Sequence, residues 1–468
     1  MLSRLLRQGG SYAIAGALLK GAGLILAPLL LNAQYLPVED YGSLALLMVT
    51  AQLAVFVAGL GQPTALLRFM SQKDAHENAD ALPGTALAVS AGAGLLAGLL
   101  LWLGAEPLAR LLTGSSANAS LLVPVAVYVA IKCAAGVPLA LLRVQERAGR
   151  YTVAVVFEMA VLIVLAYYQL AVRGNGLEGL LQSYAWSAGV ALFVLLAFTA
   201  PSVRWRLDPA ASRALLKFGV PLVLAALAGW FLNAGDRYIL NWLADREAVA
   251  TYEWSARLAG LINMLLVQSF QLAFTVVGLK ALASGAAGFY RRTFRHFTIW
   301  TGAAILVLSI WTPEGMRVLI WLFDIEAAYL QATTLVFPLA LGFGAYGIYI
   351  IVNNALLSSG RTGVIGANIV GVATLNAVLN ILLIPWLGAL GAALSTTFSY
   401  AVLAGVAAWT ARKEIQVTYP WRIPAIVTAL LLAGFAAGMG AELLPSGVRS
   451  VAKLGVTAAY LGAIPLLG

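Results

Sequence analysis

The sequence predicts an all-α polytopic membrane protein with about 14 transmembrane helices. Hydrophobic residues make up 61% of its 468 residues, whereas charged residues make up only 10%. The mean hydropathy is +0.89. Apolar segments of roughly 20 residues, long enough to cross a hydrocarbon core, recur from end to end. A chain this apolar cannot hide its surface in a water-soluble core, so we expect it to lie in a bilayer.

The expected spans follow one another with short polar loops between them. The first half holds six spans, at 9–32, 42–62, 82–104, 119–141, 151–172 and 178–200. After a basic linker the second half holds eight, at 215–238, 250–278, 296–312, 330–357, 363–385, 389–411, 421–443 and 449–467. The ninth span is the weakest, because it has only about 17 residues before Pro313.

The two halves share features at a constant offset, which predicts a duplication. Tyr41 and Tyr252, which open the second and eighth spans, lie 211 residues apart. The same offset relates the pair Gly149–Arg150 to the pair Gly360–Arg361, in the loops after spans four and ten. We therefore expect two pseudo-repeated six-helix bundles around a central cavity, plus two C-terminal helices. The expected divisions are an N-terminal bundle (1–200), a cytoplasmic linker (201–217), a C-terminal bundle (218–412) and an additional helix pair (413–468).

Lysine and arginine are distributed unevenly between the two sides of the membrane. Of 29 such residues, 19 lie in one set of alternate loops and 7 in the other. Because cytoplasmic loops carry the positive excess, both termini are expected in the cytoplasm. The net charge of +10 therefore reflects membrane topology, and we expect no nucleic-acid partner. No outer loop is long enough for a catalytic domain, so we expect no enzyme activity.

Cysteine and histidine give no sign of a metal or redox centre. The single cysteine, Cys133, excludes an intrachain disulfide, and the two histidines fall in separate charged loops without a ligand cluster. We therefore expect no metal and no cofactor. A coupling ion is not identified by the sequence, and both H⁺ and Na⁺ stay open.

Several charged residues fall inside expected spans, where a charge costs about 3 kcal/mol unless it faces a cavity or a partner. Lys20 and Arg257 lie at middle depth in spans one and eight and are candidate substrate-binding cations. Lys132 in span four is a third candidate, with the alternative that it forms an ion pair with Glu158 in span five. Arg257 has the same alternative with Glu253, one helical turn earlier.

Asp236 and Arg237 lie near the outer end of span seven. Two interpretations stay open for this pair. It is either an interfacial cap, in which Asp236 pairs with a neighbour, or a gate or coupling site that changes partners between the inward-open and outward-open states. Glu158 and Glu253 are further candidates for such a role.

Amide side chains recur on the spans around these charges. Each one alone is more often an interhelical hydrogen bond than a ligand contact. Together with the cations they predict a polar, net positive cavity for an anionic, hydroxyl-rich substrate. These amides are Asn32, Gln52, Asn233, Asn263, Gln268, Gln271, Asn353, Asn354, Asn368, Asn376 and Asn380.

Three segments of the sequence resemble the polysaccharide and O-antigen flippases. Residues 218–240 (FGVPLVLAALAGWFLNAGDRYIL), followed by VATYEWSARLAG at 249–260, are similar to the seventh and eighth helices of that family. Residues 353–402 are similar to its eleventh and twelfth helices, and residues 9–47 fit its first two. The resemblance implies the multidrug/oligosaccharidyl-lipid/polysaccharide exporter fold, in which two six-helix bundles surround a central cavity and work by alternating access.

The resemblance also implies a substrate and a location. The substrate would be an oligosaccharide on a polyprenyl diphosphate lipid, moved from the cytoplasmic to the outer face of a bacterial inner membrane for polysaccharide or O-antigen biosynthesis. A diphosphate favours Lys and Arg, which agrees with the cavity cations. The implied partners are the lipid-linked oligosaccharide, membrane lipids and other membrane proteins of polysaccharide assembly.

Three alternatives stay open beside this function. The additional helix pair is typical of relatives that flip the lipid-linked peptidoglycan precursor, in which the last two of fourteen helices form a lipid groove. A cation-coupled drug exporter is less favoured, because its cavity should be acidic. A non-transporting envelope-assembly scaffold is less favoured, because it would have no need of cavity cations.

Overall fold

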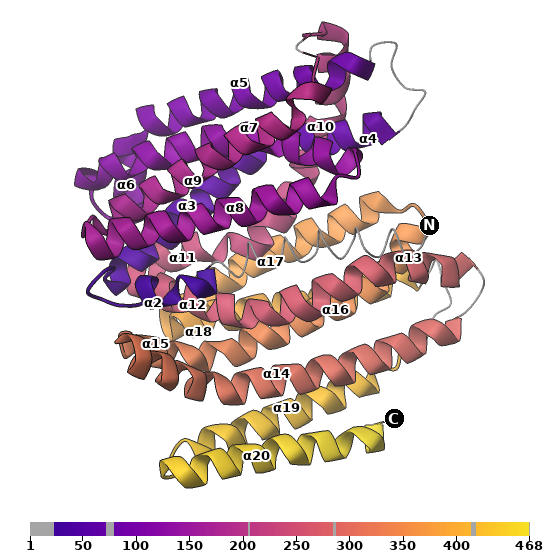
Figure 1. Cartoon of the computed structure of the whole chain (residues 1–468). Helices are drawn as coiled ribbons and strands as arrows, with labels where there is room; N and C mark the ends of the chain where they lie inside the picture. The colour runs from indigo at the N-terminus through magenta and orange to yellow at the C-terminus, as the bar shows by residue number, and fades with distance from the viewer. Residues whose placement is uncertain (1–22, 72–78, 205, 284–286, 413–417, 468) are drawn as a thin grey trace. The chain divides into compact units, whose positions relative to one another are not determined.

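The computed structural model of the chain describes residues 23–71, 79–204, 206–283, 287–412 and 418–467. Within these ranges the chain forms helices and no strand (Figure 1). The chain divides into two compact units, residues 1–230 and 231–468. The predicted all-α fold class is confirmed, whereas the predicted four-part division stays a prediction.

The first unit is built around α7, which packs against α3, α4, α5 and α9. Small residues allow α5 to approach α7 closely, because a Cβ at Gly98 would lie 2.8 Å from the carbonyl oxygen of Ala126. The hydroxyl of Ser90 donates to the carbonyl of Cys133 at 2.7 Å between the same helices. The helices of this part of the chain are α2 (Ala27–Leu30), α3 (Val38–Ala58), α4 (Gln62–Ser71), α5 (Leu82–Leu103), α6 (Ala105–Thr113), α7 (Leu122–Val144), α8 (Ala148–Tyr167), α9 (Gly176–Thr199) and α10 (Pro209–Ala234).

The second unit is built around α16, which packs against α12, α13, α14 and α18. Glycines again face the neighbours of the central helix, since a Cβ at Gly344 would lie 2.9 Å from the side chain of Ile305. The helices are α11 (Asp236–Leu243), α12 (Arg246–Ile262), α13 (Ser269–Ala283), α14 (Ala287–Phe323), α15 (Ala328–Ala332), α16 (Val336–Ser358), α17 (Thr362–Leu387), α18 (Ala389–Ala411), α19 (Arg422–Ala441) and α20 (Ser446–Ala463). The last two pack against α14.

The central helices of the two units repeat one local structure. Both α7 and α16 contain 23 residues. Each ends in a turn with positive φ, 55° at Glu146 and 72° at Gly360. The next residue closes the turn in both cases, by Arg147 N to Leu142 O at 2.9 Å and by Arg361 N to Leu356 O at 3.2 Å. Arg147 is therefore the counterpart of Arg361, and the predicted match with Gly149–Arg150 was wrong by three residues.

Ten described helical segments are long and apolar enough to cross a membrane, or up to eleven if the bent α10 counts as one span. The bend in α10 is 40° and follows Pro221, which interrupts the backbone hydrogen bonding of the helix. Helices also occupy the expected eighth span, in α12 and α13, and the expected fourteenth, in α20, although these are not among the ten. The predicted count of 14 is therefore not confirmed.

The ninth expected span is longer than the sequence indicated. We expected it to end before Pro313, but α14 continues through this residue and contains 37 residues. Proline inside a membrane helix is tolerated where neighbouring groups compensate for the lost hydrogen bond. Pro313 cannot donate to the carbonyl of Ser309, four residues earlier, and the hydroxyl of Thr312 donates in the same turn to a different carbonyl, that of Leu308, at 2.5 Å. The prediction was wrong because the proline alone does not end a helix that is packed on both sides.

Candidate functional site

A chain of alternating acidic and basic side chains joins α11 to α12 in the second unit. Arg237 Nη1 donates to Asp236 Oδ1 at 2.7 Å, and Arg237 Nε and Nη2 each donate to Glu253 Oε2 at 3.2 Å. Arg257 Nε donates to Glu253 Oε1 at 3.0 Å, across one turn of α12. Glu253 therefore bridges two arginines, and the predicted pairing of Arg257 with Glu253 is confirmed.

Asp236 is the most deeply buried of these four charged side chains and is only 1% exposed. Its Oδ2 accepts hydrogen bonds from the hydroxyl of Tyr252 and, at 3.4 Å, from the hydroxyl of Thr396. The guanidinium of Arg237 also lies over the Tyr252 ring, 5.2 Å from its centroid. The pairing expected of Asp236 is present, but the residue lies in the packed interior of the unit. Its role as a gate or coupling residue stays a prediction.

Aromatic and amide groups lie beside the same cluster. The hydroxyl of Tyr400 donates to Asn233 Oδ1 at 3.5 Å, and the Asn233 carbonyl accepts from Arg237 Nη1 at 2.9 Å. The ring of Tyr346 lies 5.2 Å from that of Tyr400 and 5.6 Å from that of Tyr349. Flat rings with a few polar groups are typical of small-molecule sites. The three tyrosines were not among the predicted site residues, because single tyrosines in apolar spans carry no spacing signal.

Lys132 and Glu158 form an ion pair between α7 and α8 in the first unit. Lys132 Nζ lies 2.8 Å from Glu158 Oε1 and 3.2 Å from Oε2, and the two side chains are 22% and 14% exposed. The ammonium also lies 5.9 Å from the centroid of the Tyr128 ring, which meets the ring of Tyr184 edge-on. The predicted ion pair is confirmed, and both groups keep part of their surface accessible.

The predicted cavity amides have different environments. Asn32 Oδ1 accepts from the backbone N–H of Gln34 at 2.8 Å, in the turn before α3. Asn380 Nδ2 donates to Asn376 Oδ1 at 3.0 Å, and both residues are 0% exposed. Each of these hydrogen bonds joins an amide to a residue only two or four positions away in the sequence.

The remaining amides lie on several helices of both units. Asn263 and Gln268 begin and end a π-helical segment, a feature that is frequent at functional sites. The side-chain oxygens of Asn263 and Asn353 are buried and have no hydrogen-bond partner among the described residues. Gln52 and Asn233 are exposed, and Gln271 is half-buried, whereas Asn354 and Asn368 donate to neighbouring helices. Lys20 lies outside the described residues.

An ion cluster that was not among the predicted site residues joins α14 to the end of α19 and to α20. Lys453, which is 0% exposed, donates to Glu314 Oε1 at 3.0 Å and to Glu442 Oε1. Arg317 contacts the same two carboxylates, and Arg449 lies 3.7 Å from Glu442 Oε2. The cluster thus holds three cations and two carboxylates. The only sequence signal was the three-residue spacing of Glu314 and Arg317, since its other members lie more than a hundred residues away.

Neutralising the carboxylate of Glu442 is expected to destabilise the folded protein more than neutralising the ammonium of Lys453. Glu442→Gln would leave three cations around one carboxylate, a loss of about 3 kcal/mol if the buried charge stays unpaired. Lys453→Met would leave two cations and two carboxylates, so we expect a smaller loss. Thermal unfolding of the purified variants measures the difference. Equal melting temperatures for the two variants would contradict this ordering.

The pH dependence of Glu442 follows from the same contacts. Burial disfavours its charged form, but the hydrogen bonds and charges of Arg317 and Lys453 outweigh burial and lower the pKa of the carboxyl below 4.5. A lowered pKa in the folded state stabilises the fold above pH 4.5, and this stabilisation is lost as the pH falls through the lowered value.

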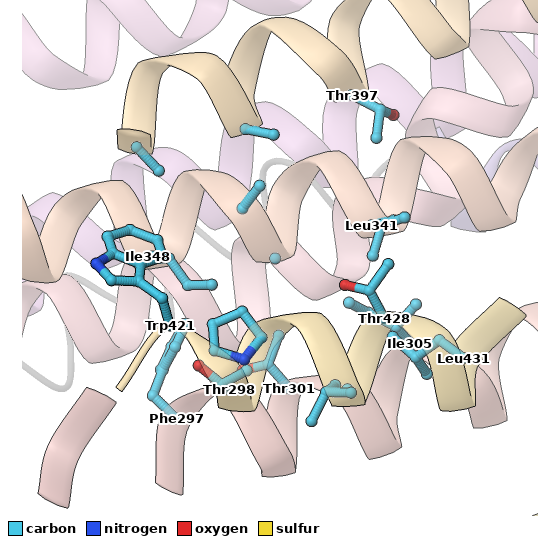
Figure 2. A pocket seen from close by; sticks show the side chains of 17 residues that line it. Phe297, Thr298, Thr301, Ile305, Leu341, Ile348, Thr397, Trp421, Thr428 and Leu431 are labelled. Carbon is cyan, nitrogen blue, oxygen red and sulfur yellow. The ribbon is translucent and has the colours of Figure 1, made fainter. Parts of the chain in front are cut away.

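An apolar cavity of about 210 Å³ lies between α14, α16, α18 and α19. Figure 2 shows the ring of Trp421 at one end, near Ile348 and Phe297, and Leu341 and Leu431 toward the other end. Its lining is almost entirely aliphatic and aromatic apart from threonines. The first helix of the C-terminal pair therefore forms one wall of a cavity suited to a hydrocarbon chain.

Comparison with known families gives a match over more than half of the chain. The sequence profile of the family described as polysaccharide biosynthesis protein matches residues 5–275. A search of curated protein sequences finds no match.

Solved structures share the fold at low sequence identity. A structure of the lipid II flippase MurJ in an inward closed conformation has a TM-score of 0.77 and 14% identity, and the match covers 98% of this chain and 99% of that chain. An inward-facing multidrug resistance MATE family transporter of the MOP superfamily has a TM-score of 0.68 and 16% identity, covering 87% and 95%. A MATE structure in complex with MaD3S has a TM-score of 0.60 and 17% identity, covering 90% and 96%. The fold is thus that of polytopic transporters of this kind.

Proposed function

Because this chain belongs to the polysaccharide biosynthesis protein family, we propose that it is an alternating-access flippase for a polyprenyl-diphosphate-linked oligosaccharide. The substrate would move from the cytoplasmic to the outer face of the membrane for polysaccharide or O-antigen biosynthesis. The observation that carries this proposal is the family match over residues 5–275. The transporter fold supports the mechanism, and the charged and aromatic groups described above support the substrate class.

Each unit offers an ion-paired cation as a proposed contact for a diphosphate headgroup. Lys132 and Arg257 are 22% and 26% exposed, so part of each cation is accessible beside its carboxylate. A diphosphate carries more negative charge than one carboxylate and offers more acceptor oxygens, so it would compete for the same donors. We propose that Glu158 and Glu253 hold these cations until the diphosphate replaces them. Lys20 remains a third candidate cation.

The oligosaccharide is expected to contact the aromatic and amide groups near this cluster. Tyr346 presents a partly exposed ring that packs against the buried rings of Tyr349 and Tyr400, and Asn233 presents an exposed amide beside Tyr400. Rings cover the apolar faces of a sugar, and the amide would exchange hydrogen bonds with its hydroxyl groups. These groups would position the glycan, whereas the lipid tail would remain in the membrane.

Asp236 and Arg237 are the proposed coupling residues. Arg237 contacts two carboxylates, Asp236 and Glu253, and Glu253 also contacts Arg257. Displacement of Glu253 from Arg257 by substrate would therefore change the charge balance around Arg237, and through it around the buried Asp236. This shared arginine connects the proposed headgroup contact to the packed interior of the unit.

Flipping of a lipid-linked peptidoglycan precursor is the second candidate function. It is favoured by the likeness of fold to the lipid II flippase, which covers 98% of this chain and therefore includes the C-terminal pair α19 and α20. A drug exporter is less favoured. The carboxylates Glu158, Asp236 and Glu253 each pair with a cation, so they offer no free negative charge to a cationic drug.

Reconstitution with defined substrates tests the proposed function. The purified protein is placed in liposomes that contain either a polyprenyl-diphosphate-linked oligosaccharide or the lipid-linked peptidoglycan precursor, with an imposed H⁺ or Na⁺ gradient. We expect protein-dependent transfer of the oligosaccharide lipid to the opposite face, measured by its accessibility to an added glycosidase. Transfer of the precursor alone would favour the second function, and transfer of neither would favour a non-transporting scaffold.

A further inference from the structure

A second cavity lies where α18 ends and α19 begins. Its volume is about 450 Å³. The residues that line it are Gly405, Ala408, Trp409, Arg412, Thr418, Tyr419 and Trp421. It is built from residues on either side of 413–417, which lie outside the described residues.

Arg412 brings a positive charge to this cavity. Its guanidinium stacks over Trp409, 5.5 Å from the centroid of the indole ring, and the side chain is exposed. No carboxylate lines the cavity in the described part of the chain, and the exposed Thr418 adds a hydroxyl donor. A planar guanidinium that is held by an aromatic ring, with no carboxylate beside it among the described lining residues, is suited to a phosphate group.

Trp421 lines both this cavity and the apolar cavity of Figure 2. The apolar cavity continues along α19 from Trp421 to Leu431, which corresponds to roughly 15 Å at the rise of an α-helix. That length is about half of a 30 Å hydrocarbon core, and so about one leaflet. Arg412, which lines the cavity that shares Trp421, therefore lies near the Trp421 end of an apolar cavity about as long as one acyl chain.

We propose that these cavities form one binding site for an anionic phospholipid of the cytoplasmic leaflet, with its phosphate at Arg412 and one acyl chain between α14, α16, α18 and α19. Arg412 belongs to the loops that carry the positive excess, and basic pockets between helices on that side bind anionic lipid headgroups. Trp409 and Trp421, 55% and 42% exposed, fit the aromatic belt at the membrane surface.

This lipid is distinct from the transported substrate. A cavity of about 210 Å³ that is one leaflet long suits a single acyl chain and is far too small for a polyprenyl chain that exceeds the membrane thickness. The lipid would stay bound and fill the space between α19 and the rest of its unit. The proposal therefore goes beyond the proposed function and does not depend on which substrate is moved.

Lipid binding to the full-length protein in detergent tests the site by native mass spectrometry. Phosphatidylglycerol and phosphatidylcholine with the same acyl chains are added to the wild type, to Arg412→Gln and to Arg422→Gln. Arg422 is the matched control, because it begins α19 and is exposed but lines neither cavity. We expect the wild type and Arg422→Gln to prefer phosphatidylglycerol, and Arg412→Gln to bind it roughly tenfold more weakly.

A second pair of variants tests the acyl-chain channel. Ala401→Phe would fill the apolar cavity and is expected to weaken binding of phosphatidylglycerol, whereas Val378→Phe on α17 lines neither cavity and is expected to have no effect. Inorganic phosphate at the same concentration should not displace the lipid. Wild-type binding by Arg412→Gln, or full displacement by phosphate, would overturn the proposal. Lipid binding without any translocation would leave this site intact and count only against the flippase function.

Discussion

Replacing Arg257 with Gln is expected to reduce translocation of the lipid-linked oligosaccharide to background while the protein still inserts into the membrane. In this variant Glu253 keeps its contacts with Arg237, so its charge is not left unpaired. The fold should therefore tolerate the change, and the lost function would be the contact with the diphosphate. A hydrogen bond to a charged group is worth about 1.5–3 kcal/mol, or roughly 10- to 100-fold in affinity.

A matched arginine on the same helix controls for the loss of charge. Arg246 is the first residue of α12, at the end remote from Arg257, and Arg246→Gln should translocate like the wild type. Lys20→Gln is expected to lose translocation as Arg257→Gln does. Transport at wild-type rate in both Lys20→Gln and Arg257→Gln would contradict the assignment of these cations to the substrate.

Replacing Asp236 with Ala is expected to cause a large loss of stability. The carboxylate is 1% exposed, pairs with Arg237 and accepts from the hydroxyls of Tyr252 and Thr396. Its removal would leave Arg237 and Arg257 with Glu253 as their one shared carboxylate. The buried hydroxyls of Tyr252 and Thr396 would also lose this acceptor. Removing one partner of a buried ion pair typically costs about 3–5 kcal/mol.

Two further variants separate charge from hydrogen bonding at this position. Asp236→Asn keeps an acceptor oxygen for Tyr252 and should lose less stability than Asp236→Ala. Thr396→Val removes only the 3.4 Å hydrogen bond and should cost about 1 kcal/mol or less. Thermal unfolding in detergent measures all three variants. A melting temperature of Asp236→Ala no lower than that of Thr396→Val would contradict the importance of the buried ion pair.

Contacts within one helix or between consecutive helices could be predicted from the sequence. Glu253 and Arg257 are separated by one helical turn, so their pairing follows from helix geometry alone. Lys132 and Glu158 lie at similar distances from one connecting loop, which brings them to the same depth on antiparallel neighbours. The all-helical fold could also be predicted, because the length of each apolar span is a property of one continuous segment of the sequence.

Contacts between distant helices could not be predicted in this way. Thr396 reaches Asp236 from 160 residues away, and Lys453 reaches Glu314 from 139 residues away. Such pairs depend on how α18 and α20 pack, and nothing in the spacing of a single sequence specifies that packing. The continuation of α14 through Pro313 has the same origin, because neighbouring helices stabilise a segment that local propensity would end.

Substrate binding by carboxylate variants tests most directly whether a diphosphate replaces Glu253 beside Arg257 and Glu158 beside Lys132. Affinity for a polyprenyl diphosphate is measured for Glu253→Gln, Glu158→Gln, Arg257→Gln and Lys132→Gln, after unfolding curves have shown that each variant is folded. We expect both Glu→Gln variants to bind at least as tightly as the wild type, and both cation variants to bind roughly tenfold more weakly. Weaker binding by all four variants, or wild-type binding by Arg257→Gln and Lys132→Gln, would contradict the proposed exchange.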